Sequence, residues 1–118
     1  MRRLLISLLI LLSINHCDAQ FVNSGTIRST NSNISADTFV NTGTLEGLDN
    51  VDLECLVLVG DGLIKGPIIN IIAKSFEYTG KIECDGECII TTDTPVENLK
   101  FTKVGRGKFS YKKYSEQN

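Results

Sequence analysis

Histidine is almost absent from this sequence. The single histidine, His16, lies in an apolar N-terminal segment, so residues 20–118 contain none. Nucleophilic Ser-His and Cys-His pairs need an imidazole as their base, and histidine is also the commonest metal ligand. The composition therefore argues against these hydrolase classes and against a histidine-based metal site. We expect a protein that is not an enzyme, with no catalytic residue, no bound metal and no cofactor.

Cysteine is scarce as well. Four are present, and Cys17 belongs to the N-terminal segment, which leaves Cys55, Cys84 and Cys88. Three cysteines are too few for a disulfide-built scaffold, and an odd number leaves at least one unpaired within the chain. The core must therefore come from the packing of apolar side chains.

Long apolar runs are missing except near the N-terminus, where one extends from Leu4 to Ile14. Arg2 and Arg3 precede this run and Cys17-Asp18-Ala19 follows it, a pattern typical of a secretory signal peptide cleaved after Ala19. The run is shorter than the roughly 20 residues that span a bilayer, although an uncleaved anchor is the alternative. We expect residues 1–19 to be removed, no stable membrane span to remain, and the chain to be exported to the periplasm, the outer surface or the medium of a bacterium.

The rest of the chain repeats one phrase. The four copies are FVNSGTIRS (residues 21–29), FVNTGTLEG (39–47), LVGDGLIKG (58–66) and FEYTGKIEC (76–84). A fixed period near eighteen residues is the mark of a stacked repeat protein.

Alignment of the copies gives columns of like residues at spacings of two, which is strand periodicity. The columns are Ile27, Leu45, Ile64, Ile82; Ser29, Gly47, Gly66, Cys84; Ile34, Leu53, Ile71; and Ala36, Cys55, Ala73. One copy cannot bury its apolar face alone, but copies stacked about 4.8 Å apart bury these columns against one another. The pattern predicts an all-β fold, a small single-domain right-handed β-solenoid (β-helix) of four to five coils with about 18 residues per coil. Residues 20–93 would form the repeats, and residues 94–118 a terminal coil or cap with a basic tail.

Two further columns have predicted structural roles. The glycine column consists of Gly25, Gly43, Gly62 and Gly80. We expect it to supply the φ values that sharp bends between strands require. The outward column Arg28, Glu46, Lys65, Glu83 alternates in charge, which predicts cross-strand ion pairs and not a pair of catalytic carboxylates.

Beyond Cys84 two registers fit the sequence. In the first, Ile89 and Thr91 continue the aliphatic and small columns. In the second, which we prefer, Val96, Asn98, Phe101 and Gly105 form a fifth coil after an excursion. Residues 107–111 would then be a last strand, closing an otherwise unpaired sheet edge.

The segment Cys84-Asp85-Gly86-Glu87-Cys88 is the sharpest chemical feature. It is compatible with a labile disulfide, half of a metal site, a structural disulfide or two free thiols. The columns place Cys84 inside and Cys88 outside, which argues against a bond between them. Cys55 shares its column with two alanines, so we expect a small buried residue there.

Charge is unevenly distributed. Residues 20–99 hold four basic and twelve acidic residues, whereas residues 100–118 hold six basic residues and one acidic residue. The basic residues are Lys100, Lys103, Arg106, Lys108, Lys112 and Lys113. They predict contact with an anionic cell-surface glycan or with the acidic body of another copy, while a merely solvated tail is the alternative. An exported chain is not expected to bind nucleic acid.

With these columns in place, the copies FVNSGTI and FVNTGTL resemble the repeats of filamentous-haemagglutinin-type adhesins, which are exported right-handed β-helices. The resemblance covers Phe21 to Thr92 and departs in length, because such adhesins have many coils. The pattern A-x-x-F-x-x-x-G-x-[IL]-x-G at Ala36 to Gly47 is similar to that of bactofilins, small β-helices that polymerise as a cytoskeletal scaffold. Bactofilins match the size but not the signal peptide. Neither resemblance implies catalytic residues.

Taken together, the sequence predicts an exported structural or surface-interaction β-solenoid, adhesin-like and without catalytic activity. The alternative is a bactofilin-like scaffold that assembles through its solenoid ends.

Overall fold

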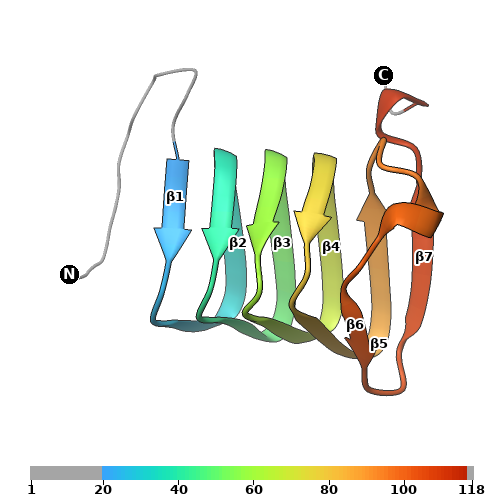
Figure 1. Ribbon diagram of the computed structural model, residues 1–118. Coiled ribbons are helices and arrows are strands. Elements are labelled where there is room, and N and C mark those ends of the chain that lie inside the picture. Colours follow the sequence, from blue (N-terminus) through green and yellow to red (C-terminus); the bar gives the residue numbers. More distant parts are fainter. Residues whose placement is uncertain (1–19, 117–118) are drawn as a thin grey trace.

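The computed structural model describes residues 20–116, and the predicted signal peptide lies outside these residues (Figure 1). Seven strands and two short 3-10 helices make up the described chain. In order they are β1 (Gln20–Asn23), β2 (Thr26–Asn41), β3 (Thr44–Gly60), β4 (Leu63–Tyr78), β5 (Lys81–Thr91), η2 (Val96–Asn98), β6 (Thr102–Val104), β7 (Lys108–Lys112) and η3 (Tyr114–Glu116). No helix in this part of the chain is long and apolar enough to cross a membrane.

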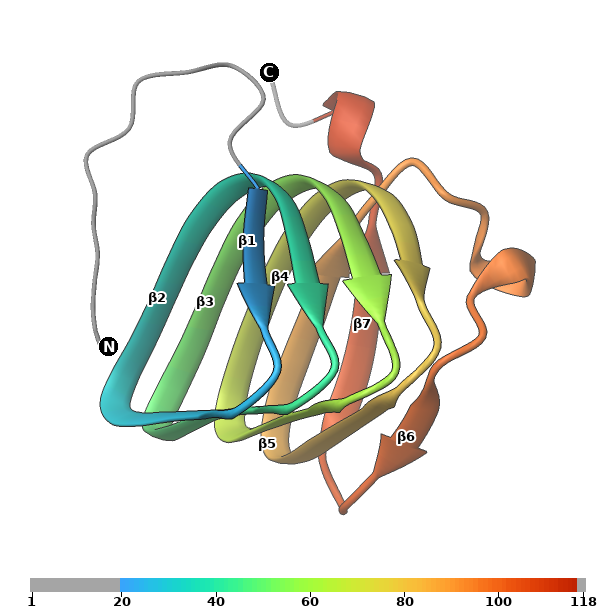
Figure 2. The ribbon, with the colours of Figure 1, turned by 60° about the vertical axis from the view of Figure 1, so that its left-hand side comes forward.

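The strands pair in parallel and wind into a coil. From β1 to β5, each residue lies opposite the one 18 or 19 positions later, as Phe21 does opposite Phe39 and Asn31 opposite Asn50. Figure 2 shows the N-terminal coil in front and the chain running clockwise as it recedes, so the winding is right-handed. The predicted all-β right-handed β-solenoid is confirmed, with about five turns.

Each long strand bends and supplies several arms of a coil (Figure 2). In β3 the first arm is residues 44–47, the second is 50–55 and the third is 57–60. We call the sheet built from the second arms the middle sheet. It consists of residues 31–36, 50–55, 68–73, 87–91 and 108–112, from β2, β3, β4, β5 and β7.

The core consists of the predicted aliphatic columns. Leu45, Ile64 and Ile82 lie in register in successive first arms and are fully buried. The middle sheet contributes a second buried column, Leu53, Ile71 and Ile90. Because apolar side chains of adjacent coils stack directly, each coil excludes water from the next.

The first predicted register beyond Cys84 is wrong. Ile90, and not Ile89, lies opposite Ile71 and continues the buried column. The corner of β5 holds one residue more than that of β4, since Gly66 pairs with Cys84 but Ile68 pairs with Glu87. This insertion moves every later side chain by one position, which exchanges the inner and outer faces.

The second predicted register is also wrong, although one contact is as expected. The Phe101 ring lies 5.4 Å from that of Phe76, as a stacked column requires. However, Thr102 pairs with Lys81, so the Phe101 backbone lies opposite Gly80 and Gly105 falls in a turn outside the glycine column. The intervening chain leaves the stack through η2, which the columns do not specify.

The C-terminal end of the stack is covered by aromatic rings. On β7, Phe109 lies opposite Cys88 and Tyr111 opposite Ile90, so both rings continue buried columns. The Lys103 ammonium on β6 lies 5.5 Å and 5.6 Å from the centroids of these two rings, a cation–π arrangement. At the other end, the first coil leaves Phe21 37% exposed.

The repeated glycines lie where adjacent coils approach most closely. A Cβ on Gly43, Gly62 or Gly80 would overlap a carbonyl oxygen of the preceding coil. That oxygen accepts a hydrogen bond from the residue after the glycine, as when the Leu63 amide donates to Gly43 at 2.8 Å. The predicted reason for this column is wrong, because the positive φ values of the described glycines occur at Gly60 and Gly105. The column provides room for backbone, not conformational freedom.

A polar column lies inside the coil next to the glycines. The Asn23 amide donates to Asn41 Oδ1 at 2.9 Å, and the buried Asn41 amide donates to the Leu63 carbonyl at 3.1 Å. In the same column, Gly60 is the residue on β3 and Tyr78 is the residue on β4. Since Gly60 has no side chain, the Asn41 amide reaches the Tyr78 hydroxyl at 3.4 Å across the intervening coil. Burial is the main reason that the pKa of Tyr78 rises to about 12.

Substitution of the column glycines should separate close packing from backbone freedom. Gly62→Ala should lower the free energy of unfolding by at least about 2 kcal/mol, because its Cβ has no space against the Gly43 carbonyl. The matched control is Gly25→Ala, whose Cβ would meet no atom within 4 Å and should change stability by under about 0.5 kcal/mol. Denaturant unfolding measures both, and equal losses would contradict the packing explanation.

Tyr78 should make the fold sensitive to alkali. The unfolded chain releases its tyrosine proton near pH 10, whereas the folded chain holds it to about 12. Stability from this group is therefore complete below pH 10 and falls as the pH rises towards 12, by up to about 2–3 kcal/mol. Tyr78→Phe should lose less stability over the same interval in urea unfolding, even though the buried thiols titrate in both proteins. Parallel curves for the two proteins would refute this assignment.

Candidate functional site

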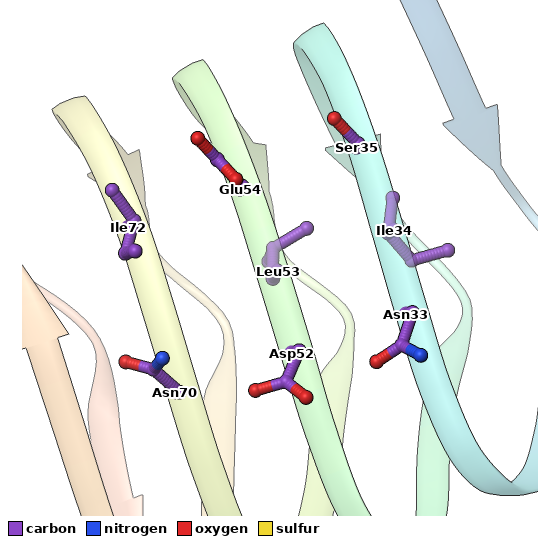
Figure 3. Close-up of a pocket in the computed structure, with 8 residues that line it drawn as sticks. All are labelled: Asn33, Ile34, Ser35, Asp52, Leu53, Glu54, Asn70 and Ile72. Carbon is purple, nitrogen blue, oxygen red and sulfur yellow. The ribbon is translucent and has the colours of Figure 1, made fainter.

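A shallow open groove of about 340 Å³ lies on the outer surface of the middle sheet (Figure 3). Its lining residues come from β2, β3 and β4, and they are Asn33, Ile34, Ser35, Asp52, Leu53, Glu54, Asn70 and Ile72. Successive side chains of a strand point to opposite faces, so the residues on either side of the buried column face outward. The groove is thus the outer counterpart of the predicted core column.

Amide and carboxylate side chains form a row across the groove. Asn33 lies opposite Asp52, and Asp52 lies opposite Asn70, so these side chains stand on three adjacent strands at the same level. The amide of half-buried Asn50 donates to Asp52 Oδ2 at 2.8 Å, which orients that carboxylate. The row offers hydrogen-bond donors and acceptors to water and to a partner that lies along the surface.

The outer surface of the middle sheet has three zones along the stack. An acidic zone on β3 contains Asp52 and Glu54. An isoleucine zone follows on β4 and β5, and it consists of Ile68, Ile72 and Ile89. A lysine zone on β7 ends the face, with Lys108 and Lys112 projecting to the same side as the groove residues. We call this whole surface the middle-sheet face.

The basic residues predicted to contact an anion do not form one cluster. Lys108 and Lys112 share the outer side of β7, whereas Lys103 lies over the aromatic rings on the inner side. The remaining ones lie at exposed positions around these strands, and they are Lys100, Arg106 and Lys113. The lysine zone is therefore the part of the basic tail that shares a face with the groove.

The predicted charge ladder is confirmed. Arg28 Nε lies 3.2 Å from Glu46 Oε1, and Lys65 Nζ lies 3.8 Å from Glu83 Oε2. All four residues project outward from first arms, on a different face from the groove. Exposed pairs of this kind contribute little individually, about 0–1 kcal/mol, but opposite signs in adjacent coils favour the observed register.

All three described cysteines are free and buried. The prediction that Cys88 faces outward is wrong, because the extra corner residue of β5 turns its side chain into the core. Cys55 pairs with Ala36 and Ala73 in the predicted small column. The Cys84 thiol donates to the Pro67 carbonyl at 3.5 Å. Among residues 20–116, no three His, Cys, Asp or Glu side chains gather where they could hold a metal ion.

Burial also determines the titration of these thiols. It raises the pKa of Cys55 and of Cys88 to about 12, and it raises the pKa of Cys84 above its usual range. Thiolates react with alkylating reagents and disulfides, whereas thiols do not. The three groups are therefore small core residues that are protected from such reagents at neutral pH.

Alkylation should report this protection. At neutral pH the native chain should remain essentially unmodified by iodoacetamide over times that label a free model thiol completely, because the thiolate fractions and solvent access are both low. The denatured chain should take up three labels in mass spectrometry if Cys17 has been removed with the signal peptide. Rapid native labelling of Cys84 or Cys88 would contradict their burial.

The row Asn33, Asp52, Asn70 was not singled out from the sequence, although its signal is present there. Each residue comes directly before a member of the column Ile34, Leu53, Ile71, so the same period places the three on one outer row. The lysine zone has no such signal, because the excursion between β5 and β6 interrupts the period.

Comparisons with protein-family models, with curated proteins and with solved structures find no match for this chain. The chemistry of the solenoid's faces is therefore what supports a functional assignment.

Proposed function

We propose that this chain is an exported β-solenoid without catalytic activity that acts as an adhesin-like surface-interaction protein. Its contact surface is the middle-sheet face, and its partner is an anionic cell-surface glycan or another copy of itself. The pattern of Arg2, Arg3 and the run from Leu4 to Ile14 supports export. The open row Asn33, Asp52, Asn70 is the observation that carries the proposal.

The shape of the groove favours a large partner over a small molecule. Small-molecule sites are concave and bury most of their ligand, whereas this groove is open and follows the surface across three strands. Its polar row lies along the stacking direction, so an extended chain or another flat surface can contact all three side chains together.

The carboxylates of the groove do not suggest a hydrolase. Asp52 and Glu54 both project from β3 into open solvent, and their neighbours are amides, the Ser35 hydroxyl and an isoleucine. A catalytic carboxylate pair flanks its substrate in a cleft that excludes water. Contact through hydrogen bonds is the role that this arrangement supports better.

The alternative is a scaffold that polymerises through its ends, and the exposed first coil favours it. Phe21 is 37% exposed and Val22 53% exposed, and β1 pairs with β2 on one side. The other end weighs against it, since β7 is the last layer there and carries Lys108 and Lys112, and lysines on an edge strand disfavour pairing with a further coil. Electron microscopy separates the two proposals, because long unbranched filaments would favour the scaffold.

Binding to intact cells tests the adhesin-like proposal. The purified exported chain should bind cells of its own species or host, and Asn33→Ala, Asp52→Ala and Asn70→Ala together should weaken binding about tenfold or more. Two or three hydrogen bonds of about 0.5–1.5 kcal/mol each account for this loss. The matched control is Thr38→Ala with Ser75→Ala on the third arms, which should leave binding unchanged.

Three results would count against the proposal. They are a chain that stays in the cytoplasm on fractionation, equal binding by the groove variant and the control variant, and turnover of a polysaccharide that depends on Asp52 or Glu54.

A further inference from the structure

The middle-sheet face carries opposite charges at its two ends. Glu54 and Asp52 stand on β3, whereas Lys112 and Lys108 stand on β7. The strands between them are β4 and β5, so the two charged zones lie three layers apart, about 14 Å. The isoleucine zone separates them, and within it Ile68 is 55% exposed.

The charged side chains at these ends are available to a partner. Neither Glu54 nor Lys112 takes part in an ion pair with another described residue. The ion pairs among the described residues, Arg28–Glu46 and Lys65–Glu83, both lie in the first arms. Glu87 lies beside Lys108 in the same outer row and offsets part of its charge. Lys112 lies beside Thr91, which is neutral, so it carries most of the positive field of the lysine zone.

A twofold axis makes this face complementary to itself. When the axis runs parallel to the strands and passes between β4 and β5, β3 of one copy faces β7 of the other. The rotation keeps each residue at the same level along the strands, so Glu54 of each copy faces Lys112 of the other. Asp52 faces the position between Lys108 and Lys112 of the other copy. Around the axis β4 of one copy faces β5 of the other, so Ile68, Ile72 and Ile89 lie against Glu87, Thr91 and Asn70. The centre of the contact is therefore a mixture of apolar and polar side chains, and the opposite charges of Glu54 and Lys112 flank it.

We propose that the middle-sheet face binds the same face of a second copy, with the coils of the two copies stacked in opposite directions, forming a twofold dimer. The proposal rests on the proposed function only in taking this face as the contact surface. It would make the adhesion homophilic, with each copy recognising another copy.

A second copy fits the face better than an anionic polysaccharide does. A polyanion lying along the face is attracted by the lysine zone but repelled by Asp52 and Glu54 at the other end. A second copy places an opposite charge against both zones at once. Because the interface is isologous, the pair of Glu54 with Lys112 occurs twice in every dimer.

The size of the face predicts a weak dimer. The four layers that overlap are β3, β4, β5 and β7, each with strands of five or six residues. They give an interface that buries on the order of 1,000 Å² in total, at the low end for specific complexes. We expect micromolar or weaker affinity that falls with added salt, since rim charges are screened. Many copies on one surface would still adhere firmly through multivalency.

Charge exchange tests the arrangement directly. The purified exported chain should show a concentration-dependent monomer–dimer equilibrium in analytical ultracentrifugation. Lys112→Glu and Glu54→Lys each place like charges opposite one another, and each should weaken the dimer at least tenfold. The double variant Glu54→Lys with Lys112→Glu restores opposite charges at both ends, so its dimer should return to within about threefold of the wild type.

The matched control is Lys81→Glu, which makes the same change of charge on a first arm and should leave the dimer unchanged. Circular dichroism and thermal unfolding show whether each variant is folded. A wild-type chain that is monomeric at all accessible concentrations, or a double variant that stays as weak as the single ones, would overturn the dimer.

A polyanion is the other occupant that the test can reveal. If an anionic polysaccharide such as a polyuronate binds the monomer, and the single Lys112→Glu and the double variant lose it equally, the dimer proposal fails. Should cell binding then still depend on Asn33 and Asn70, the proposed adhesin-like function stands without the dimer. Loss of cell binding in Lys112→Glu with rescue in the double variant supports both.

Discussion

Close contact between the backbones of successive coils is the constraint on which this structure depends. At the glycine column the carbonyl of one coil lies where a side chain of the next would otherwise be, and it accepts a hydrogen bond from the residue that follows the glycine. This contact holds the layers in register. The aliphatic columns, the charge ladder and the buried asparagines all follow, because each needs like positions directly above one another.

The same constraint divides the chain into repeated and unrepeated residues. Inward positions repeat because they must match the layer below, whereas outward positions are free to differ from coil to coil. On the middle-sheet face this freedom gives carboxylates on β3, isoleucines on β4 and lysines on β7. A rod built from equivalent layers therefore carries a face whose two ends differ in charge.

Most of the fold could be predicted from the sequence, because its information is periodic and local. The period placed Leu45, Ile64 and Ile82 correctly, and it could also have placed Asn33, Asp52 and Asn70. The period identified Gly62 as a structural glycine, but the predicted role in a sharp bend was wrong. A close backbone approach and a left-handed φ both require glycine, so the sequence does not distinguish them. The period failed at Cys88 and Phe101, because one extra corner residue and a nonrepeating excursion each change the register without changing composition. The lysine zone depends on that excursion and could not be located from the sequence.

The bond from Asn41 to Tyr78 bears on how such a protein can grow. Solenoids lengthen by duplication of whole repeats, which is tolerated when each layer interacts only with its immediate neighbours. Here a side chain of β2 reaches one of β4 past the vacant position of Gly60, so three layers form one indivisible unit. A duplicated coil inserted within this unit would leave a buried amide and a buried hydroxyl apart from each other. Duplication inside the unit would therefore cost about 1–3 kcal/mol for the hydroxyl left without its partner, a cost that duplication on either side of the unit avoids.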